Sequence, residues 1–445
     1  MILARQLADE LFGKVLKYSC AEETEASITG TSYSLTRFAN NAIHQNVSEE
    51  DLNISVRAVS DHRTARASTN KTDDDSIRET CEAALELARL QPPDPEMLPL
   101  PGPQTYRVVN RLDQETAQLS PQVRAETVRQ VIDRAEKDHL TAAGVFSSGS
   151  SAQALYNSRG ISAFHEESVS EFSVTMLGET SSGWAKRTGQ QGRTLGVDEL
   201  ADRAARKALS SREPREVPAG KYTVILEPSA VMDLLGFFLL DFGGLAVDEQ
   251  RSCFTGRVGA KVMGENIQIH DDVYHPSQSG APFDGEGVPR QRVTLVENGV
   301  VKNLVYCRQT AQKMKTQPTG HGFPLPNEYG EAPLNLVFEG GHHSEEEMIR
   351  STTRGLLVTR FWYIREVDPY TKILTGMTRD GTFLIEDGEL KYGVKNFRFN
   401  QSLLEMLNQV EMMSAPVRAA GEESVEMVVP TMKVKDFNFS SITKF

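Results

Sequence analysis

Histidine–acid pairs are the first candidates for metal or acid–base chemistry in this sequence. His165-Glu166 matches the start of a metallopeptidase helix, in which a second histidine four residues later completes the metal site. That position holds Val169, and the surrounding SVSEFSVTML alternates polar and apolar residues as a strand does. We therefore predict no metal site at His165.

Two other histidine clusters offer weaker signals. His342-His343 precedes a helix and has no acid or cysteine at ligand spacing, which predicts a solvated turn. His270-Asp271-Asp272 and His275 supply nitrogen and oxygen donors, but the pattern favours a polar loop. The sequence thus predicts no metal ligands in this chain.

The side chains that serve as nucleophiles elsewhere form no complete set here. Cys20, Cys81, Cys253 and Cys307 are scattered, without a CxxC pair, and predict reduced thiols rather than a zinc knuckle or a disulfide framework. Neither a Gly-x-Ser-x-Gly elbow nor a Walker A loop is present. A hydrolase based on Cys253 or Cys307 would need a histidine from elsewhere in the fold. From the residues alone we predict no catalytic residues.

Composition and charge describe a globular protein with more than one domain. The chain has 445 residues, of which 39% are hydrophobic and 24% charged. Its net charge of −13 argues against direct nucleic-acid binding, because such binding depends on Lys and Arg neutralising phosphates. No run reaches the roughly 20 apolar residues of a membrane helix, and the N-terminus has the pattern of an amphipathic helix rather than a signal peptide. We expect a cytoplasmic protein.

Proline content and periodicity divide the chain into segments that would position any site. Residues 1–91 predict an α/β unit. Residues 92–104 include six prolines, which exclude helix and central strand, so we expect a semi-rigid connector there. Residues 105–217 predict a helix, three strands and a helix, the first helix capped by Ser120 with Pro121 in its first turn.

Residues 218–445 predict a strand-rich C-terminal domain. Asn298-Gly299 indicates a hairpin, and Ser344 to Glu347 form a capping box before a short helix. Asp380-Gly381 and Asp387-Gly388 predict the turns of a meander. LLEMLNQVEMM predicts a helix and MKVKDFNFSSI a closing strand. With the preceding segments, these elements indicate an α+β fold.

Four C-terminal segments together resemble the TldD/PmbA family, once described as modulators of DNA gyrase. They are FTGRVGAKV, QRVTLVENGVVKNLVYCRQTAQKM, NLVFEGGHHSEEEMIRSTTRGLLVTRFW and LTGMTRDGTFLIEDGELKYGVKNFRFNQS. The N-terminal SLTRFANNAIHQN extends the resemblance over nearly the whole chain.

The resemblance implies a two-lobed α+β fold with mixed or antiparallel sheets and a dimeric assembly. In this family the TldD type of subunit is a zinc metallopeptidase, and the TldE or PmbA type lacks the metal site. The pair trims unfolded or short peptides. An effect on gyrase through a proteolysed regulator is compatible with the charge of this chain, whereas direct action on DNA is not favoured.

The apolar stretch VMDLLGFFLLDFGG decides which type this chain resembles. The metal-bearing type carries His-Glu-x-x-x-His on a helix after a strand like YTVIL, and shortly before a segment like FTGRVG. Counting back from Phe254 places the three motif positions at Leu235, Gly236 and Leu240. The family's third ligand is a cysteine in the C-terminal half, and no cysteine follows Cys307. We therefore expect the metal-free type, inactive alone, with zinc in the partner subunit.

The resemblance implies that such a subunit supplies substrate-binding and dimer surface in a heterodimer with a TldD-like metallopeptidase. The meander over 375–399 predicts a strand edge that pairs with extended peptides. His321, Arg379, Asp380 and Asn400 are the candidate peptide-binding residues. For two of them the sequence also permits a structural role, because Asp380-Gly381 favours a turn and Asn400 is placed to cap a helix.

The main alternative is a stand-alone homodimer that binds peptides or a partner protein without proteolysis. An apolar segment and open strand edges suit such a scaffold equally well. A homodimer is also compatible with expression of this chain alone. The sequence does not separate the two assemblies.

Overall fold

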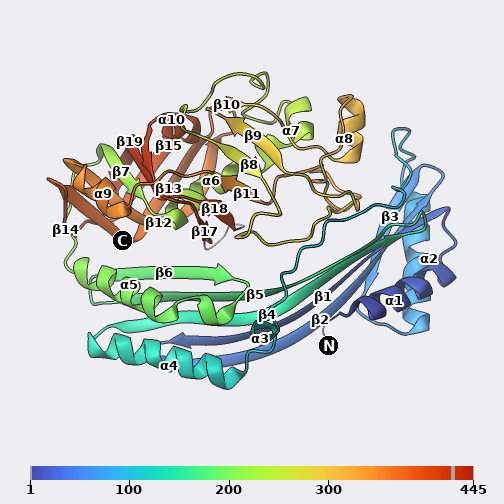
Figure 1. The fold of residues 1–445 in the computed structure, drawn as a ribbon, viewed down its shortest axis with the longest axis horizontal. Helices are drawn as coiled ribbons and strands as arrows, with labels where there is room; N and C mark the ends of the chain where they lie inside the picture. Colours follow the sequence, from blue (N-terminus) through green and yellow to red (C-terminus); the bar gives the residue numbers. More distant parts are fainter. Residues whose placement is uncertain (1–2, 422–425, 444–445) are drawn as a thin grey trace.

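The chain folds into two lobes that lie against each other (Figure 1). The computed structural model describes residues 3–421 and 426–443. One six-stranded sheet forms the N-terminal lobe, and two further sheets form the strand-rich C-terminal lobe. This is the two-lobed α+β fold that the sequence predicts.

The N-terminal lobe is a long antiparallel sheet in the order β3-β2-β1-β4-β5-β6. Because β1 pairs with β4, the segments before and after the proline-rich connector share one sheet. Residues 92–103 form neither helix nor strand, as their prolines predict. The elements of this lobe are α1 (Arg5–Tyr18), β1 (Glu23–Ala39), β2 (Ala42–Ser60), β3 (Arg63–Thr69), α2 (Asp74–Leu90), α3 (Gln114–Ala117), α4 (Pro121–Lys137), β4 (Thr141–Asn157), β5 (Ser162–Leu177), β6 (Ser182–Gly189) and α5 (Val197–Ser210).

Two hydrophobic cores hold helices against this sheet. The apolar stripes of α1 and α2 pack on β1 to β4, and those of α4 and α5 pack around Phe146 and Phe172. Ser120 caps α4 by accepting a hydrogen bond from the backbone N–H of Val123, with Pro121 as its first residue. None of the described helices is both long and apolar enough to cross a membrane.

The C-terminal lobe contains a sheet in the order β10-β9-β8-β11-β18-β17 and another in the order β12-β7-β19-β15-β13-β14. Its elements are β7 (Gly220–Leu226), α6 (Pro228–Leu235), α7 (Gly244–Asp248), β8 (Ile269–Asp271), β9 (Val293–Glu297), β10 (Val300–Val301), α8 (Arg308–Lys313), β11 (Leu336–Phe338), α9 (Glu345–Arg350), β12 (Arg354–Asp368), β13 (Ile373–Glu386), β14 (Glu389–Gly393), β15 (Phe397–Ser402), α10 (Leu403–Asn408), β16 (Val410–Met413), β17 (Val417–Ala419), β18 (Met427–Val429) and β19 (Met432–Ile442). The predicted hairpin at Asn298-Gly299 and the capping box at Ser344 are confirmed.

The predicted strand edge over residues 375–399 is mostly absent. β12 pairs with both β7 and β13, so five strands close into a ring. β13 and β15 therefore have neighbours on both sides. Of the predicted meander, β14 has one strand neighbour, β13, and Arg215 bonds its last residue, Gly393. The start of β14 is therefore the part left for an added strand.

The predicted turn at Asp380-Gly381 is wrong. Both residues lie inside β13, where Val358 pairs with Thr382 and Arg360 pairs with Arg379. One extra residue on β13 makes this a β-bulge, and the φ angles of 52° at Asp380 and 126° at Gly381 accommodate it. An Asp-Gly pair favours positive φ, which a bulge uses as readily as a turn. The turn at Asp387-Gly388 is confirmed.

The predicted helix LLEMLNQVEMM is also too long. α10 ends at Asn408, and Val410 begins β16, which pairs with β19. Val410 is buried through its pairing with β19. Ser402 caps α10, so Asn400 is not the cap; it lies exposed on β15.

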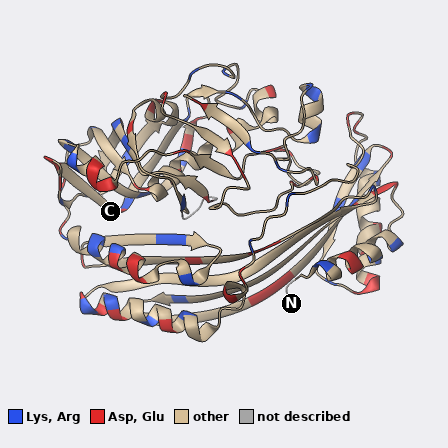
Figure 2. Cartoon of the chain, in the orientation of Figure 1, with Lys and Arg blue, Asp and Glu red and all other residues tan. Residues whose placement is uncertain are grey.

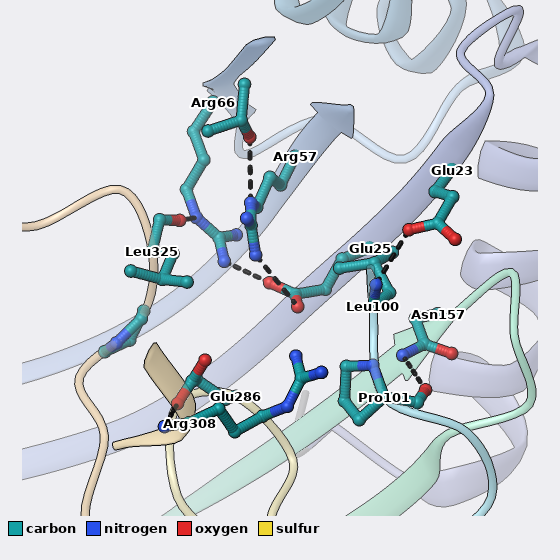
Figure 3. Close-up of polar contacts among 12 residues, drawn as sticks. Glu23, Glu25, Arg57, Arg66, Leu100, Pro101, Asn157, Glu286, Arg308 and Leu325 are labelled. Carbon is teal, nitrogen blue, oxygen red and sulfur yellow. Dashed lines mark hydrogen bonds and ion pairs between the residues drawn. The ribbon is translucent and has the colours of Figure 1, made fainter. Parts of the chain in front are cut away.

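A buried cluster of charged residues connects one end of the N-terminal sheet to the C-terminal lobe (Figure 3). Glu25 of β1 pairs with Arg57 and Arg66, and Arg66 also donates to the carbonyl of Leu325. Arg308 donates to the carbonyl of Pro99 over 2.7 Å. These contacts fix the sheet, the connector and the loop before β11 relative to one another.

Candidate functional site

The stretch Val231–Gly244 is only partly the core helix that its composition predicts. α6 ends at Leu235, and the chain continues in two 3₁₀ turns over 236–238 and 240–242. Gly236 has low helix propensity, and the rings of Phe238 and Phe242 both contact Phe254. These aromatic contacts therefore stabilise the 3₁₀ turns.

The two carboxylates in this stretch are already engaged by the protein. Asp233 accepts a hydrogen bond from the backbone N–H of Phe361 over 3.2 Å. Asp241 accepts one from the N–H of Cys253 over 2.8 Å and forms an ion pair with Lys372. Burial disfavours the Lys372 ammonium, but Asp241 and Glu366 outweigh this effect and raise the pKa of Lys372. A fixed cation thus occupies one side of Asp241.

These residues do not fit a peptidase zinc site. Such a site needs three protein ligands and an open position for water. Leu235 and Gly236 offer no donor, and Leu240 is 42% exposed to solvent without one. Within residues 3–421 and 426–443, no group of three His, Cys, Asp or Glu side chains is arranged to hold a metal.

A cavity with a volume of about 1110 Å³ lies at the junction of the lobes. Three edge strands line this cavity, each the last strand of its sheet, namely β6, β17 and β14. The N-terminal ends of α6 and α9 and one face of α5 complete the wall. In Figure 2 the basic segment of β6 and the acidic start of α9 lie on the two lobes bordering this junction. A cavity bounded by free strand edges suits an extended peptide, whose main chain pairs with such edges.

Four charged side chains form the inner wall of this interlobe cavity. Lys207 of α5 donates to Glu227 over 2.7 Å, and Arg203 contacts Glu227 at 3.0 Å and Glu345 at 3.8 Å. Burial lowers the pKa of Lys207, whereas Glu227 raises that of Arg203. Burial and the charge of Glu227 raise the pKa of Glu345 to about 7. Glu345 is thus a proton-exchanging group in the cavity wall near neutral pH.

Arg379 and Asp380 lie at a second polar cluster on the same junction. Arg360 donates to Asp380 through Nε over 2.9 Å, and Ser182 of β6 donates to the other carboxylate oxygen over 2.7 Å. The Arg379 guanidinium lies 4.5 Å from the ring centre of Trp362, with 45% of its side chain exposed. A smaller cavity of about 420 Å³ adjoins Asp380.

The other two predicted residues lie elsewhere. The ring of His321 is fully buried, 2.8 Å from Asp271 and 2.9 Å from Thr319. Asn400 is exposed on β15. The structure therefore brings Arg379 and Asp380 together and separates both from His321 and Asn400.

Several histidine predictions are tested by the same contacts. His165 lies in strand β5, as predicted, and His342 and His343 are exposed. The polar-loop interpretation of His270 and Asp271 is wrong, because both are buried in strand β8. The hydrogen bonds of Asp271 to His321 and to the N–H of Asn335 explain why an acid is tolerated there.

Comparison with known proteins identifies the chain. The PmbA/TldA metallopeptidase C-terminal domain matches residues 219–441, which is half of the sequence. Domain 1 of the same family matches residues 24–88, and its central domain matches residues 114–212. The chain belongs to the PmbA/TldD metallopeptidase family.

Relatives in the PmbA/TldD family vary in how much of their length this chain spans. A metalloprotease of Methanothermobacter thermautotrophicus is 27% identical over 236 residues, 50% of this chain and 49% of that protein, so the chain spans about half its length. The metalloprotease PmbA of Escherichia coli O157:H7 is 23% identical over 93% of this chain and 92% of its own. The structure of TldE from Thermococcus kodakarensis has a TM-score of 0.88 at 24% identity, covering 98% of this chain and all of that one. That likeness shows a shared fold.

Sequence reasoning missed the charged wall of the interlobe cavity in this PmbA/TldD chain. Lys207 falls between Ala204 and Ala208 on the buried side of α5. A lysine on an apolar helix face requires a buried partner. That signal pointed to an acid, but the identity of Glu227 depended on tertiary structure.

The two buried cysteines are not activated as nucleophiles. Burial and the nearby Glu331 raise the pKa of Cys307 to about 12, and burial also raises that of Cys253. A nucleophilic cysteine reacts as the thiolate, which needs a lowered pKa. The possible Cys253 or Cys307 hydrolase therefore loses support.

Proposed function

We propose that this chain is a metal-free subunit of a PmbA/TldD peptidase that binds extended peptides for a metal-bearing partner. The observation that carries the proposal is the engagement of Asp233 and Asp241. The first accepts from the Phe361 N–H, and the second pairs with Lys372. Asp241 has one cysteine, Cys253, beside it, but within residues 3–421 and 426–443 neither carboxylate belongs to a group of three His, Cys, Asp or Glu side chains that could hold a metal. The stretch after β7 therefore supplies packing and no zinc site.

The interlobe cavity supports the peptide-binding part of the proposal. Three one-sided strands border it, and an extended main chain can pair with such an edge whatever its side chains. Edge pairing suits unfolded or short substrates, which the family resemblance implies. Arg379 and Asn400 are exposed and remain proposed peptide contacts, whereas the buried His321 and Asp380 would act by holding their loop and bulge.

The partner part of the proposal rests on the family resemblance. We propose a heterodimer in the cytoplasm in which a TldD-like subunit holds zinc and cuts the peptide. This chain then contributes binding surface and no catalytic residue. It is inactive when isolated.

The native mass of the tagged chain recovered from its own host tests this assembly. A complex of this 49.3 kDa chain with a second, unequal chain of the family is the expected result. A complex of two identical chains, with no second polypeptide, would overturn the heterodimer and favour a peptide-binding homodimer.

A further inference from the structure

The interlobe cavity is lined by many charged side chains. Seven Lys and Arg residues and four Glu residues line it, although the chain as a whole carries a net charge of −13. Six of the seven cations already pair with carboxylates, and three of these acids (Glu171, Glu389 and Glu426) lie just outside the lining. The seventh, Arg206, is the lining cation left to attract an anionic group.

The helix α5 carries the largest share of this charge. Arg203, Arg206 and Lys207 line the cavity from α5. Lys207 forms an ion pair with Glu227. Arg203 forms ion pairs with Glu227 and Glu345. Arg206 is exposed, and no carboxylate of the described parts of the chain lies within ion-pair distance of its guanidinium. It is therefore the arginine of α5 with hydrogen-bonding capacity left for a ligand.

Two further lining cations, Lys186 and Arg418, pair with Glu171 and Glu426. Lys186 of β6 spans the junction to donate to the carbonyl of Gly421 over 3.0 Å, and Arg418 of β17 contacts Thr188 of β6 over 3.2 Å. These two cations hold the free edges of β6 and β17 beside each other. A peptide strand added to either edge would pass within reach of basic side chains from both lobes.

We propose that the interlobe cavity selects peptides that carry carboxylates, with Arg206 as the residue that binds them. This selectivity rests on the peptide-binding role proposed above. The guanidinium supplies paired N–H donors that match a carboxylate. The carboxylate belongs either to an Asp or Glu side chain or to the C-terminus of the peptide.

Binding of fluorescent peptides to the purified chain tests the proposal. The peptides have eight residues, the length of β6, with either Glu or Gln at alternate positions and either a free or an amidated C-terminus. We expect the Glu peptide to bind at least about tenfold more tightly than the Gln peptide, and the difference to shrink as salt is raised. If the free peptides bind more tightly than the amidated ones and the Glu and Gln peptides bind equally, the selected carboxylate is that of the peptide C-terminus.

Three variants separate the cavity from general charge effects. Arg206→Gln should bring the Glu and Gln peptides to equal affinity, and Arg206→Lys should retain part of the difference. Arg129→Gln changes an exposed arginine of α4 that does not line the cavity, and should leave the selectivity intact. Equal affinity of the unmodified chain for all four peptides (Glu or Gln, free or amidated) would overturn the selectivity and leave peptide binding standing. If none of the peptides bound, the proposed function itself would fail.

Discussion

Lys207 of the N-terminal lobe and Glu227 of the C-terminal lobe form a buried ion pair, with 2.7 Å between the ammonium and the carboxylate. Lys207 is 9% exposed and Glu227 5%. The pair joins α5 to the residue that precedes α6, so it fixes the inner wall of the interlobe cavity and ties the two lobes together.

Breaking this pair from one side should destabilise the protein strongly. Lys207→Met leaves Glu227 with Arg203 as its remaining cation, and we expect a loss of about 3–5 kcal/mol in the free energy of unfolding. The double variant Lys207→Met, Glu227→Gln should recover much of that loss, because no buried charge is left unpaired. Urea unfolding followed by tryptophan fluorescence measures both, since Trp184 lies at this junction. A loss in the double variant equal to the sum of the losses in Lys207→Met and Glu227→Gln would show that the pair is not coupled.

Glu286 should make the protein less stable as pH rises toward neutral. Burial and the neighbouring Asp284 raise the pKa of Glu286 from 4.5 to about 7, against the opposing charges of Arg308 and Arg57. The folded state therefore holds the proton more tightly than the unfolded state, and stability falls between about pH 4.5 and 7.

The variant Glu286→Gln tests this linkage. It should gain stability relative to the unmodified chain at pH 8 and little at pH 4, measured as midpoints of thermal unfolding. Glu265→Gln, at a side chain that is 82% exposed, should show no such dependence. An equal effect of Glu286→Gln at both pH values would contradict the assignment.

The bulge at Asp380-Gly381 requires glycine at its second position. Gly381 has φ of 126°, and a Cβ added there would lie 2.6 Å from the Thr359 hydroxyl. Gly381→Ala should lower the free energy of unfolding by about 1–3 kcal/mol. Gly13→Ala is the matched control, because Gly13 lies in α1 with open space around it, and should stabilise the chain by up to about 1 kcal/mol. A neutral Gly381→Ala would mean that the bulge relaxes.

Peptide binding in the interlobe cavity should strengthen for acidic peptides as pH falls through neutrality. The carboxyl of Glu345 has a pKa of about 7, raised by burial and by Glu227 against the charges of Arg203 and Lys207, with Glu346 adding to the increase. Its protonation below that pH removes one negative charge from the cavity wall. The affinity for the Glu peptide should be higher at pH 6 than at pH 8, and Glu345→Gln should flatten this dependence. Unchanged pH dependence in that variant would exclude Glu345 as its source.

The sequence predicted elements well where local signals act alone. Ser120 and Pro121 fixed the start of α4, and alternation at Phe172, Val174 and Met176 identified the buried face of β5. The resemblance added the family and the two-lobed fold. These predictions depend on residues that are close together in the sequence, so the sequence alone is enough to make them.

The failures share one cause, which is pairing between distant segments. Asp380-Gly381 has the same positive φ in a turn and in a bulge, and only the register against β12 decides between them. Val410 is buried in either a helix or a strand, and pairing with β19 selects the strand. The cavity wall likewise depends on Lys207 meeting Glu227, which the spacing of neither residue reveals.

The zinc content and peptidase activity of the purified chain test the central claim most directly. The chain is incubated with Zn²⁺, dialysed and assayed for bound metal and peptide cleavage, alone and with a metal-bearing subunit of the family. The account predicts no stoichiometric zinc and no cleavage by the chain alone, and cleavage by the mixture that a chelator abolishes. One zinc per isolated chain, together with cleavage that is lost on chelation, would contradict it.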